Sequence, residues 1–488
     1  MKIPSLETVQ RQSEGFAAFP VSCEIFADIK TPIQVLKILK SISSRCYLLE
    51  SVEGVEKWGR YSFLGFDPVV EVKCKDGLME IKNGTAVRLE TDDPGQEIRR
   101  ILSEYRSPKV AELLPFTGGF VGYFSYDYLK YSEPSLRFDG DDSAGFNDLD
   151  LMLFEKVIAF DQLRQKIVIM VTIKTDHLAV NYNRAVRELD YLVGLIHSDV
   201  PASGQLPRLL SDFKPHFDRE AYCEIVKKTK GYIREGDIFQ AVPSNRLTAE
   251  MEGSLFNTYR VLRTINPSPY MYYIACDDLE IAGASPETLV KLQDGELSTF
   301  PIAGTSPRGR TSEEDAELEE RLLKDPKELA EHNMLVDLGR NDLGRVSRYG
   351  SVKVQEYLKV QKYSHVMHIT SVVTGQLREN MDQLDAVTAV LPAGTLSGAP
   401  KIRACEIINE LEGIRRGIYG GAIGYIDFTG NMDVCIAIRT AVKKDGRVYV
   451  QSGGGVVADS DPEKEYQESI NKAMAVVEAV KQSVEVMD

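Results

Sequence analysis

Alternating and helical hydrophobic patterns follow one another along the chain. Two apolar runs, at residues 157–161 and 167–173, flank a short polar segment and predict a β-hairpin. Apolar residues between positions 186 and 196 then recur at helical spacing, which predicts an amphipathic helix. The first 200 residues are therefore expected to be strand-rich, whereas the chain after about residue 215 mixes helices with strands.

A segment rich in proline, glycine and serine, residues 199–218, separates these two parts. We interpret it as a linker between an N-terminal domain, residues 1–200, and a C-terminal domain, residues 215–488. Two short segments on either side of it, 118–127 and 420–428, resemble each other and are expected to be buried strands with closely packed glycines.

Composition and charge exclude several classes of protein. The chain has 488 residues, with 58 lysines and arginines against 73 aspartates and glutamates, a net charge of −15. This acidic balance argues against nucleic acid or an anionic membrane as the main partner. No apolar run is long enough to span a membrane, and the N-terminus lacks the apolar core of a signal peptide. Seven scattered cysteines without a CxxC pair indicate a reduced, cytoplasmic protein.

Two predicted helices carry pairs of acidic residues. Each helix begins with an Asp-Pro pair, at 325–326 and at 461–462, a typical helix start. Carboxylates spaced i, i+3 on one face could hold Mg²⁺, although glutamates near a helix start often face only water. The residues on these faces are Glu328 and Glu331 in the first helix, and Glu465, Glu468 and Lys472 in the second.

Other candidate residues occur singly. Three consecutive glycines, Gly453–Gly455, could bring backbone N–H groups close to an anion or form a simple turn. Arg439 stands within an apolar segment, predicted as a strand, and therefore needs an anionic partner. The segment 394–401 lacks the spacing of a phosphate-binding P-loop, and no cysteine stands in the context of a glutaminase nucleophile.

Taken together, these segments resemble the chorismate-utilising enzymes. PIAGTSPRG, KELAEHNMLVDLGRNDLGRV, HVMHITS, AGTLSGAPKIRA, YGGAIGY, CIAIRT and SGGGVVADSDPEKEYQE occur in the family's order within residues 215–485. LLESVEGVEKWGRYSFLG at 48–65 and NPSPYMYY at 266–273 narrow the resemblance to the large subunits of the anthranilate-forming branch. The resemblance implies a two-domain α/β fold of the α+β type, with antiparallel sheets in a sandwich and helices outside.

The resemblance also implies a reaction. Chorismate binds with Mg²⁺, ammonia adds at C2 as the C4 hydroxyl leaves, and elimination of pyruvate gives anthranilate, the first committed product of tryptophan biosynthesis. A separate glutamine amidotransferase subunit would deliver the ammonia, so a hetero-oligomer is expected, and a heterotetramer is one form it could take. Tryptophan would inhibit by feedback.

Residue roles follow from the resemblance by position. Glu331 and Glu468 match the metal ligands, with Glu328 and Glu465 beside them. Glu287 matches the general acid that protonates the leaving hydroxyl, and His368 matches a histidine near C4 and the enolpyruvyl group. The residues that match substrate-binding groups are Gly304, Thr305, Thr395, Tyr419, Arg439, Gly453, Gly454, Gly455 and Lys472.

Two positions separate the branches of the family. Relatives that add water carry a lysine general base where this chain has Gln240, and ammonia needs no such base. Aminodeoxychorismate synthases, the alternative assignment, carry a nucleophilic lysine where this chain has Ala303. The chain departs from the usual pattern at Ser306, where arginine is common, and at Ser469, where threonine is common.

The regulatory pocket is also implied by the resemblance. Cys435, four residues before Arg439, matches a cysteine near that pocket. An apolar slot with an aromatic edge suits an indole, and Glu50 or backbone carbonyls could accept from the ammonium group. The residues that match the tryptophan-binding positions are Glu50, Ser51, Pro269, Tyr270 and Met271.

Overall fold

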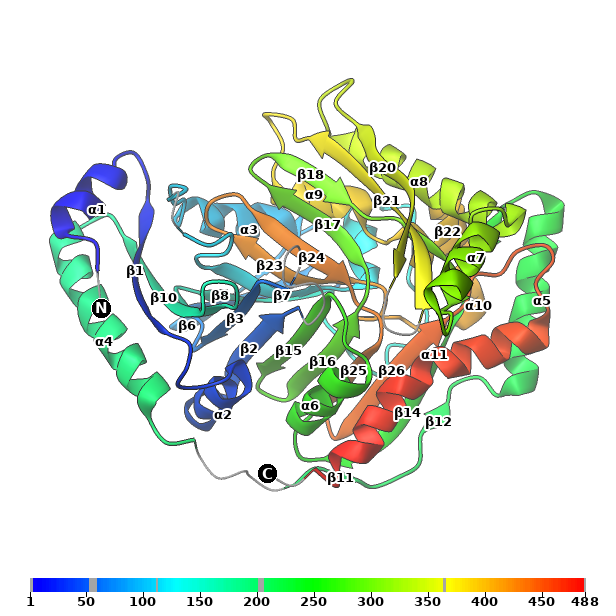
Figure 1. Ribbon diagram of the computed structural model, residues 1–488, viewed down its shortest axis with the longest axis horizontal. Helices are drawn as coiled ribbons and strands as arrows, with labels where there is room; N and C mark the ends of the chain where they lie inside the picture. Colours follow the sequence, from blue (N-terminus) through cyan, green and yellow to red (C-terminus); the bar gives the residue numbers. More distant parts are fainter. Residues whose placement is uncertain (1–2, 52–58, 111–112, 201–205, 363–365, 487–488) are drawn as a thin grey trace.

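Two large antiparallel sheets face each other in a computed structural model of the protein (Figure 1). The structure describes residues 3–51, 59–110, 113–200, 206–362 and 366–486. Part of the N-terminal motif, 52–58, and part of the predicted linker, 201–205, therefore lie outside the described residues. Helices cover the outer faces of both sheets, so the expected sandwich with helices outside is confirmed.

The first sheet has twelve strands and contains both early and late parts of the chain. In spatial order they are β1 (Ala18–Phe26), β10 (Lys166–Lys174), β9 (Lys156–Asp161), β3 (Tyr61–Phe66), β2 (Arg45–Glu50), β15 (Tyr270–Cys276), β16 (Leu279–Ser285), β25 (Thr440–Lys444), β26 (Arg447–Gly453), β14 (Ser244–Glu252) and β11 (Arg208–Leu209), with β12 (Lys214–Pro215) also on β14.

The second sheet is built in the same way and also has twelve strands. Their order is β19 (Ile302–Pro307), β21 (Val366–Gln376), β18 (Glu296–Thr299), β17 (Thr288–Gln293), β24 (Met432–Ile436), β23 (Ala422–Asp427), β7 (Gly119–Phe124), β8 (Leu149–Phe154), β4 (Val70–Lys75), β5 (Leu78–Asn83) and β6 (Thr85–Glu90), with β20 (Lys353–Lys362) on β21. A separate two-stranded sheet pairs β13 (Gln240–Ala241) with β22 (Gly398–Ala399).

The helices divide between the two outer faces and the ends of the sandwich. The first sheet is covered by α2 (Pro32–Ile42), α4 (Leu178–His197), α6 (Phe256–Ile265) and α11 (Pro462–Ser483), and the second by α3 (Pro94–Ser103), α8 (Pro326–Val346) and α9 (Gln383–Val390). The remaining helices are α1 (Leu6–Gln12), α5 (Arg219–Glu235), α7 (Ser312–Leu322), α10 (Lys401–Glu412) and the short 3₁₀ helices η1 (Tyr126–Tyr131) and η2 (Gly394–Leu396).

Side-chain alternation along the strands explains the layers. In β15, Tyr272 and Ile274 point into the core between the sheets, whereas Met271 and Tyr273 pack against the helices. Because successive side chains of a strand point to opposite faces, one strand supplies two cores. Both faces are buried, which is why these strands are apolar almost throughout.

The two similar glycine-rich segments prove to be neighbours. β7 and β23 pair antiparallel, with Gly122 opposite Gly424. A Cβ atom on Gly122 would lie 2.0 Å from the Asp150 carbonyl oxygen, and one on Gly424 would lie 2.1 Å from the Asp433 carbonyl oxygen. The prediction of buried strands with closely packed glycines is confirmed, because no side chain fits at these positions.

Other local predictions can be compared in the same way. The hairpin is β9 paired with β10, and the amphipathic helix is α4, so both predictions are confirmed. Asp325 and Asp461 cap α8 and α11 by accepting hydrogen bonds from the first turn, as the Asp-Pro pairs predicted. The predicted linker contains β11 and β12, which both pair with β14.

The predicted boundary near residues 200–215 coincides with no break between the sheets. β2 pairs with β15 and β7 pairs with β23, so strands from both sides of the boundary share each sheet. The division into an N-terminal regulatory domain, residues 1–200, and a C-terminal chorismate-binding domain, residues 215–488, stays a prediction. Among the described residues, no helix combines the length and the apolar character that crossing a membrane requires.

Candidate active site

The chain crosses between the two sheets at several places, and two of these crossovers are neighbours. β16 of the first sheet leads into β17 of the second, and Glu287 lies between them. β24 of the second sheet leads back into β25 of the first, and Arg439 lies between those strands. The Ile436 N–H donates to the Glu287 carbonyl at 3.0 Å, and the Ala284 N–H donates to the Arg439 carbonyl at 3.2 Å. The paired crossovers therefore bring an acid and a guanidinium close together.

Glu287 has the electrostatic properties of a proton donor. Dense protein around its carboxyl group raises the pKa to about 7, since burial penalises the charged form. A hydrogen bond from the Thr395 hydroxyl, at 3.1 Å, and the charges of Arg439 and Lys472 act in the opposite direction. A carboxylic acid with a pKa near neutrality can hold a proton at physiological pH and release it to a substrate.

Arg439 is held in an unusual conformation. Its φ is +50°, a left-handed value that is costly for a residue with a side chain and is often found at functional sites. The segment predicted as one strand therefore turns at Arg439, between two strands of different sheets. Its Nη1 donates to the Asn266 Oδ1 at 3.3 Å. Asn266 belongs to NPSPYMYY, and sequence reasoning did not single it out; only its place in that motif could have pointed to it.

A bulge in β19 shapes the wall beside these crossovers. The pairing of β19 with β21 shifts between Ala303 and Thr305, and the intervening Gly304 has a φ of +70°. The Nδ1 of His368 donates to the Gly304 carbonyl at 3.0 Å and lies 3.1 Å from the Thr305 hydroxyl. Burial and the charge of Arg439 lower the pKa of His368, so the ring is neutral with Nε2 as its basic nitrogen.

The three glycines form a close-packed turn after β26. A Cβ atom on Gly453 would collide with the Pro243 carbonyl at 2.4 Å, and one on Gly454 would lie 2.9 Å from Glu465 Oε2. A Cβ atom on Gly455 would lie 2.6 Å from the Nε2 of Gln240. The three glycines thus lie beside both Gln240 and the acidic face of α11. The absence of side chains lets other groups approach this backbone closely.

Four glutamates meet near the starts of α8 and α11. The pKa of Glu331 is raised by burial and by the neighbouring charges of Glu328 and Glu468. The pKa of Glu465 is raised by burial and by Glu468. Lys472 forms an ion pair with Glu468 at 2.7 Å and donates to the Gly453 carbonyl at 3.2 Å. The acidic faces of the two helices therefore interact, although the sequence alone showed only that each exists.

This donor set fits a magnesium ion. Mg²⁺ is usually held by one or two carboxylates together with water and substrate oxygens, so a preformed group of three ligands is not required. Among the described residues, the one group of three candidate ligand atoms within 4.8 Å of one another is Glu71, Cys276 and Asp277. Arg45 already neutralises that group, with ion pairs to Glu71 at 2.8 Å and to Asp277 at 2.7 Å.

Almost all the predicted site residues are thus connected in space. Tyr419 joins them through Arg416, whose guanidinium carbon lies 5.6 Å from the centre of the tyrosine ring. Of the two departures from the family pattern, Ser306 is buried in β19, and Ser469 lies fully buried in α11, where its carbonyl accepts from the Ser452 hydroxyl. The catalytic and ligand-binding roles of the site residues stay predictions.

A cavity of about 550 Å³ opens between the two sheets. Its wall carries charges of both signs, with Lys109 and Asp294 forming an ion pair at 2.7 Å. The Tyr270 hydroxyl lies 2.8 Å from the Thr288 hydroxyl, and Thr288 adjoins Glu287. The lining includes every predicted tryptophan-binding residue, Glu50, Ser51, Pro269, Tyr270 and Met271, together with Cys435.

Two of the predicted tryptophan-binding side chains, Glu50 and Met271, make their contacts on the helix side of the sheet. The Glu50 carboxylate forms an ion pair with Arg263, accepts from the Tyr259 hydroxyl at 2.6 Å, and has a nearly buried side chain. The side chain of Met271 likewise packs with the cluster under α6. Of the two acceptors that the sequence suggested, the Glu50 carboxylate is therefore already engaged by residues of α6.

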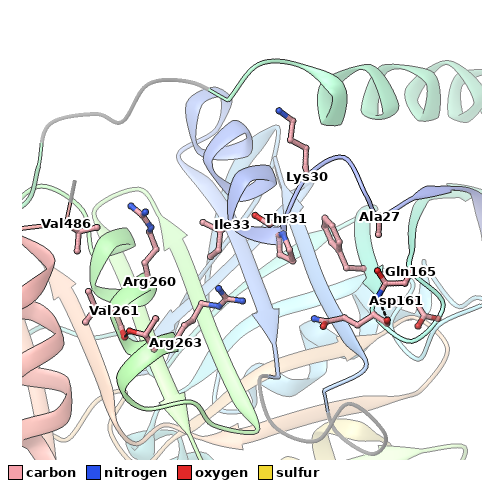
Figure 2. Close-up of a pocket in the computed structure, with 14 residues that line it drawn as sticks. Ala27, Lys30, Thr31, Ile33, Asp161, Gln165, Arg260, Val261, Arg263 and Val486 are labelled. Atoms are coloured by element: carbon pink, nitrogen blue, oxygen red, sulfur yellow. Dashed lines mark hydrogen bonds between the residues drawn. The ribbon is translucent and has the colours of Figure 1, made fainter. Parts of the chain in front are cut away.

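A second cavity, of about 690 Å³, lies on the outer side of the first sheet (Figure 2). Figure 2 shows Arg260 and Arg263 of α6 on one side of it and Asp161 and Gln165 near the β9–β10 turn on the other. It is larger than the first cavity, yet it contains none of the predicted substrate, metal or tryptophan residues.

Comparison with known proteins agrees with this architecture. Residues 45–478 match the family described as chorismate binding enzyme. Anthranilate synthase component 1 of Acetivibrio thermocellus is 45% identical over the whole of both chains, and that of Aquifex aeolicus is 46% identical over 98% of this chain and 97% of its own.

Solved structures give the same result. Anthranilate synthase component I from Streptococcus pneumoniae superposes with a TM-score of 0.73 at 39% identity, covering 93% of this chain and 99% of that one. The menaquinone-specific isochorismate synthase from Escherichia coli, at 18% identity, shares the fold with a TM-score of 0.70, covering 97% of this chain and 98% of that one. These relatives are enzymes. The chain therefore belongs to the chorismate binding enzyme family, within its anthranilate synthase component 1 group.

Proposed function

We propose that the chain is a lyase that converts chorismate and ammonia to anthranilate with loss of pyruvate. The observation that carries this proposal is Glu287, a carboxyl group with a pKa of about 7 beside the Arg439 guanidinium. An acid that stays protonated near neutral pH and a cation that attracts a carboxylate are what this reaction needs. The family assignment supports the same substrate and product.

Binding of chorismate is assigned to groups that attract its two carboxylates. Arg439 and Lys472 offer positive charge, and the Gly453–Gly455 turn offers backbone N–H groups. Tyr419 adds a hydroxyl donor. Thr305 and Thr395 line the same region through their contacts with His368 and Glu287.

Proton transfer is assigned to Glu287 and His368. Protonated Glu287 gives its proton to the C4 hydroxyl, which leaves as water while ammonia forms the new C–N bond at C2. His368, with Nδ1–H held by the Gly304 carbonyl, presents a basic Nε2 near the region from which pyruvate leaves. The bond that Gly304 makes to the ring keeps His368 in one tautomer.

Gln240 fits an ammonia-using enzyme. Its amide lies against Gly455 and is buried, so it can position a small neutral nucleophile without removing a proton from it. Neutral ammonia is nucleophilic enough to attack without a base, whereas water is a weaker nucleophile and needs a base to remove its proton. We therefore assign Gln240 to nucleophile selection.

A magnesium ion would be held by Glu331 and Glu468, with Glu328 and Glu465 orienting its water ligands. When bound, it neutralises these carboxylates and attracts a substrate carboxylate that they would otherwise repel. The raised pKa values of Glu331 and Glu465 support this assignment, because they reflect first the burial of the two carboxyl groups and then repulsion by neighbouring glutamates, and a bound cation would offset both.

Regulation and supply of ammonia complete the proposal. We assign feedback binding of tryptophan to the 550 Å³ cavity, since its ion pairs and aromatic wall suit a zwitterion with an indole ring. We assign ammonia delivery to a separate glutamine amidotransferase in a hetero-oligomer, which the component naming of the relatives supports. We infer a cytoplasmic location from the seven scattered cysteines.

One assay tests the central proposal. The purified chain is incubated with chorismate, Mg²⁺ and ammonium at mildly alkaline pH, and anthranilate is followed by its fluorescence. We expect anthranilate with ammonium and none with glutamine as the only nitrogen source. Formation of isochorismate or aminodeoxychorismate instead would refute the proposal, and turnover with glutamine by the chain alone would refute the separate partner.

A further inference from the structure

A buried ion pair beside the site makes contacts with four of its segments. Arg416 and Glu412 are each only 2% exposed. The Arg416 Nε donates to Glu412 Oε2 at 2.9 Å and its Nη2 donates to Glu412 Oε1 at 2.6 Å, a two-pronged contact. Removing two charges from water is costly, and a buried pair often adds no net stability over apolar residues of similar size. The other hydrogen bonds of the Arg416–Glu412 pair indicate its role.

Arg416 holds two backbone carbonyls of the site loops. Its Nη1 donates to the Leu396 carbonyl at 2.7 Å, directly after Thr395, whose hydroxyl bonds Glu287. Its Nη2 donates to the Val242 carbonyl at 2.7 Å, two residues after Gln240. The planar guanidinium thus fixes the distance between the loop behind the acid and the strand that carries Gln240.

The pair reaches two more segments. Glu412 Oε1 accepts from the Ser244 N–H at 2.7 Å and from its hydroxyl at 2.9 Å. Ser244 pairs in β14 opposite Gly453, the first glycine of the anion-binding turn. On the other side, the Arg416 guanidinium packs on the ring of Tyr419.

We propose that the Arg416–Glu412 pair is the positioning element of the site, which sets the relative placement of Thr395, Gln240, the Gly453–Gly455 turn and Tyr419. The inference rests on the proposed chorismate chemistry. Neither side chain needs to touch the substrate, because the pair contacts Tyr419 itself and backbone groups that lie next to the other three. A displacement of about 1 Å at a catalytic group can lower the rate about 100-fold.

Arg416→Lys tests this proposal, because lysine keeps the charge and loses the planar fork. We expect kcat/KM for chorismate to fall about 100-fold. The pKa of Glu287, read from the pH profile, should also rise. Loss of the bond to the Leu396 carbonyl lets Thr395 move, and this weakens the Thr395 hydrogen bond that lowers the pKa of Glu287. The pH profile is measured at constant free ammonia, so that the change belongs to the protein.

Arg45→Lys is the matched control. Arg45 is likewise an arginine held by charged hydrogen bonds, although it is partly exposed and bonds two carboxylates, Glu71 and Asp277. Among the described residues, neither of these partners belongs to a site segment. An Arg416→Lys enzyme with the activity and pH profile of the Arg45→Lys enzyme would overturn the proposal, whatever its thermal stability.

A milder variant keeps the proposal testable if Arg416→Lys does not fold. Ser244→Ala removes the hydroxyl bond to Glu412 and the bond that the same hydroxyl accepts from Gln451 Nε2 at 2.7 Å, but it leaves the Arg416–Glu412 pair and the Ser244 N–H bond in place. It should lower kcat/KM and shift the pH profile in the same direction as Arg416→Lys. A folded Ser244→Ala enzyme whose pH profile matches that of the unmodified enzyme would overturn the proposal. Rates are measured as consumption of chorismate, whatever the product. If the unmodified enzyme makes a product other than anthranilate, the proposed function is refuted. The comparison of the variants with the unmodified enzyme still tests the role of Arg416.

Discussion

At the scale of single residues, the raised pKa of Glu287 lowers the free energy of unfolding at neutral pH. Its pKa rises from 4.5 to about 7, so between these values the folded chain keeps a proton that the unfolded chain releases. Stability therefore falls as pH rises through that window, by at most about 3 kcal/mol. Glu287→Gln should abolish turnover and raise the melting temperature at pH 8 but not at pH 4. A variant that melts like the parent at both pH values would contradict the assigned pKa.

The acidic faces of α8 and α11 give a second prediction. Glu331→Gln and Glu468→Gln should each abolish activity at low Mg²⁺ while the fold, followed by circular dichroism, is retained. Glu328→Gln and Glu465→Gln should cost less, about 10–100-fold, because they act through water. Glu320, an exposed glutamate of α7 paired with Lys324, supplies the control Glu320→Gln, which should behave like the parent. Full activity of Glu468→Gln at low Mg²⁺ would remove Glu468 from the ligand set.

The sequence could identify these residues by resemblance, yet not their surroundings. Gln240 and Gly455 are far apart along the chain and touch only because β13 and the glycine turn meet. The pKa of Glu287 depends on burial between two crossovers, which no local pattern records. Arg439 was expected inside a strand because its neighbours are apolar; the chain instead turns there to change sheets.

At the scale of elements, the local hydrophobic pattern predicted single helices and hairpins. The β9–β10 hairpin and α4 followed from adjacent apolar patterns. Sheet order did not, because β2 with β15 and β7 with β23 are pairings between distant parts of the chain. The likeness of the two glycine-rich segments was visible in the sequence, but their pairing required the fold.

Glycines at two places should respond oppositely to alanine. In Gly122→Ala the new Cβ would meet the Asp150 carbonyl at 2.0 Å, so the strands must separate at a cost of about 3 kcal/mol or more. Gly231 lies inside α5 with no atom within 4 Å of a new Cβ, so Gly231→Ala should stabilise the helix by about 0.5–1 kcal/mol. Thermal and urea denaturation would measure both, and equal effects would contradict the packing of β7 against β8.

At the scale of the whole molecule, hydrogen bonds link the 550 Å³ cavity between the sheets to the candidate active site. Cys435 lines the 550 Å³ cavity and belongs to β24, the strand that leads into the Arg439 crossover. Tyr270 reaches Thr288, next to Glu287, and Asn266 accepts from Arg439. Both belong to NPSPYMYY, so a ligand that shifts this segment would shift the acid and the guanidinium together. A coupling of about 1–3 kcal/mol is ordinary for such a link.

Ser51→Leu tests this coupling. Ser51 lines the cavity between the sheets, and a leucine there should occupy the space that an indole needs, so inhibition by tryptophan should be lost while uninhibited turnover stays near that of the parent. Thr264→Leu, which crowds the outer cavity instead, should leave inhibition intact. Coupling is reciprocal, so chorismate should weaken tryptophan binding to the parent by the same factor by which tryptophan weakens chorismate binding, as calorimetric titration can measure. If Ser51→Leu remained as sensitive as the parent, tryptophan would have to bind elsewhere, and the links through Tyr270 and Asn266 would serve packing alone.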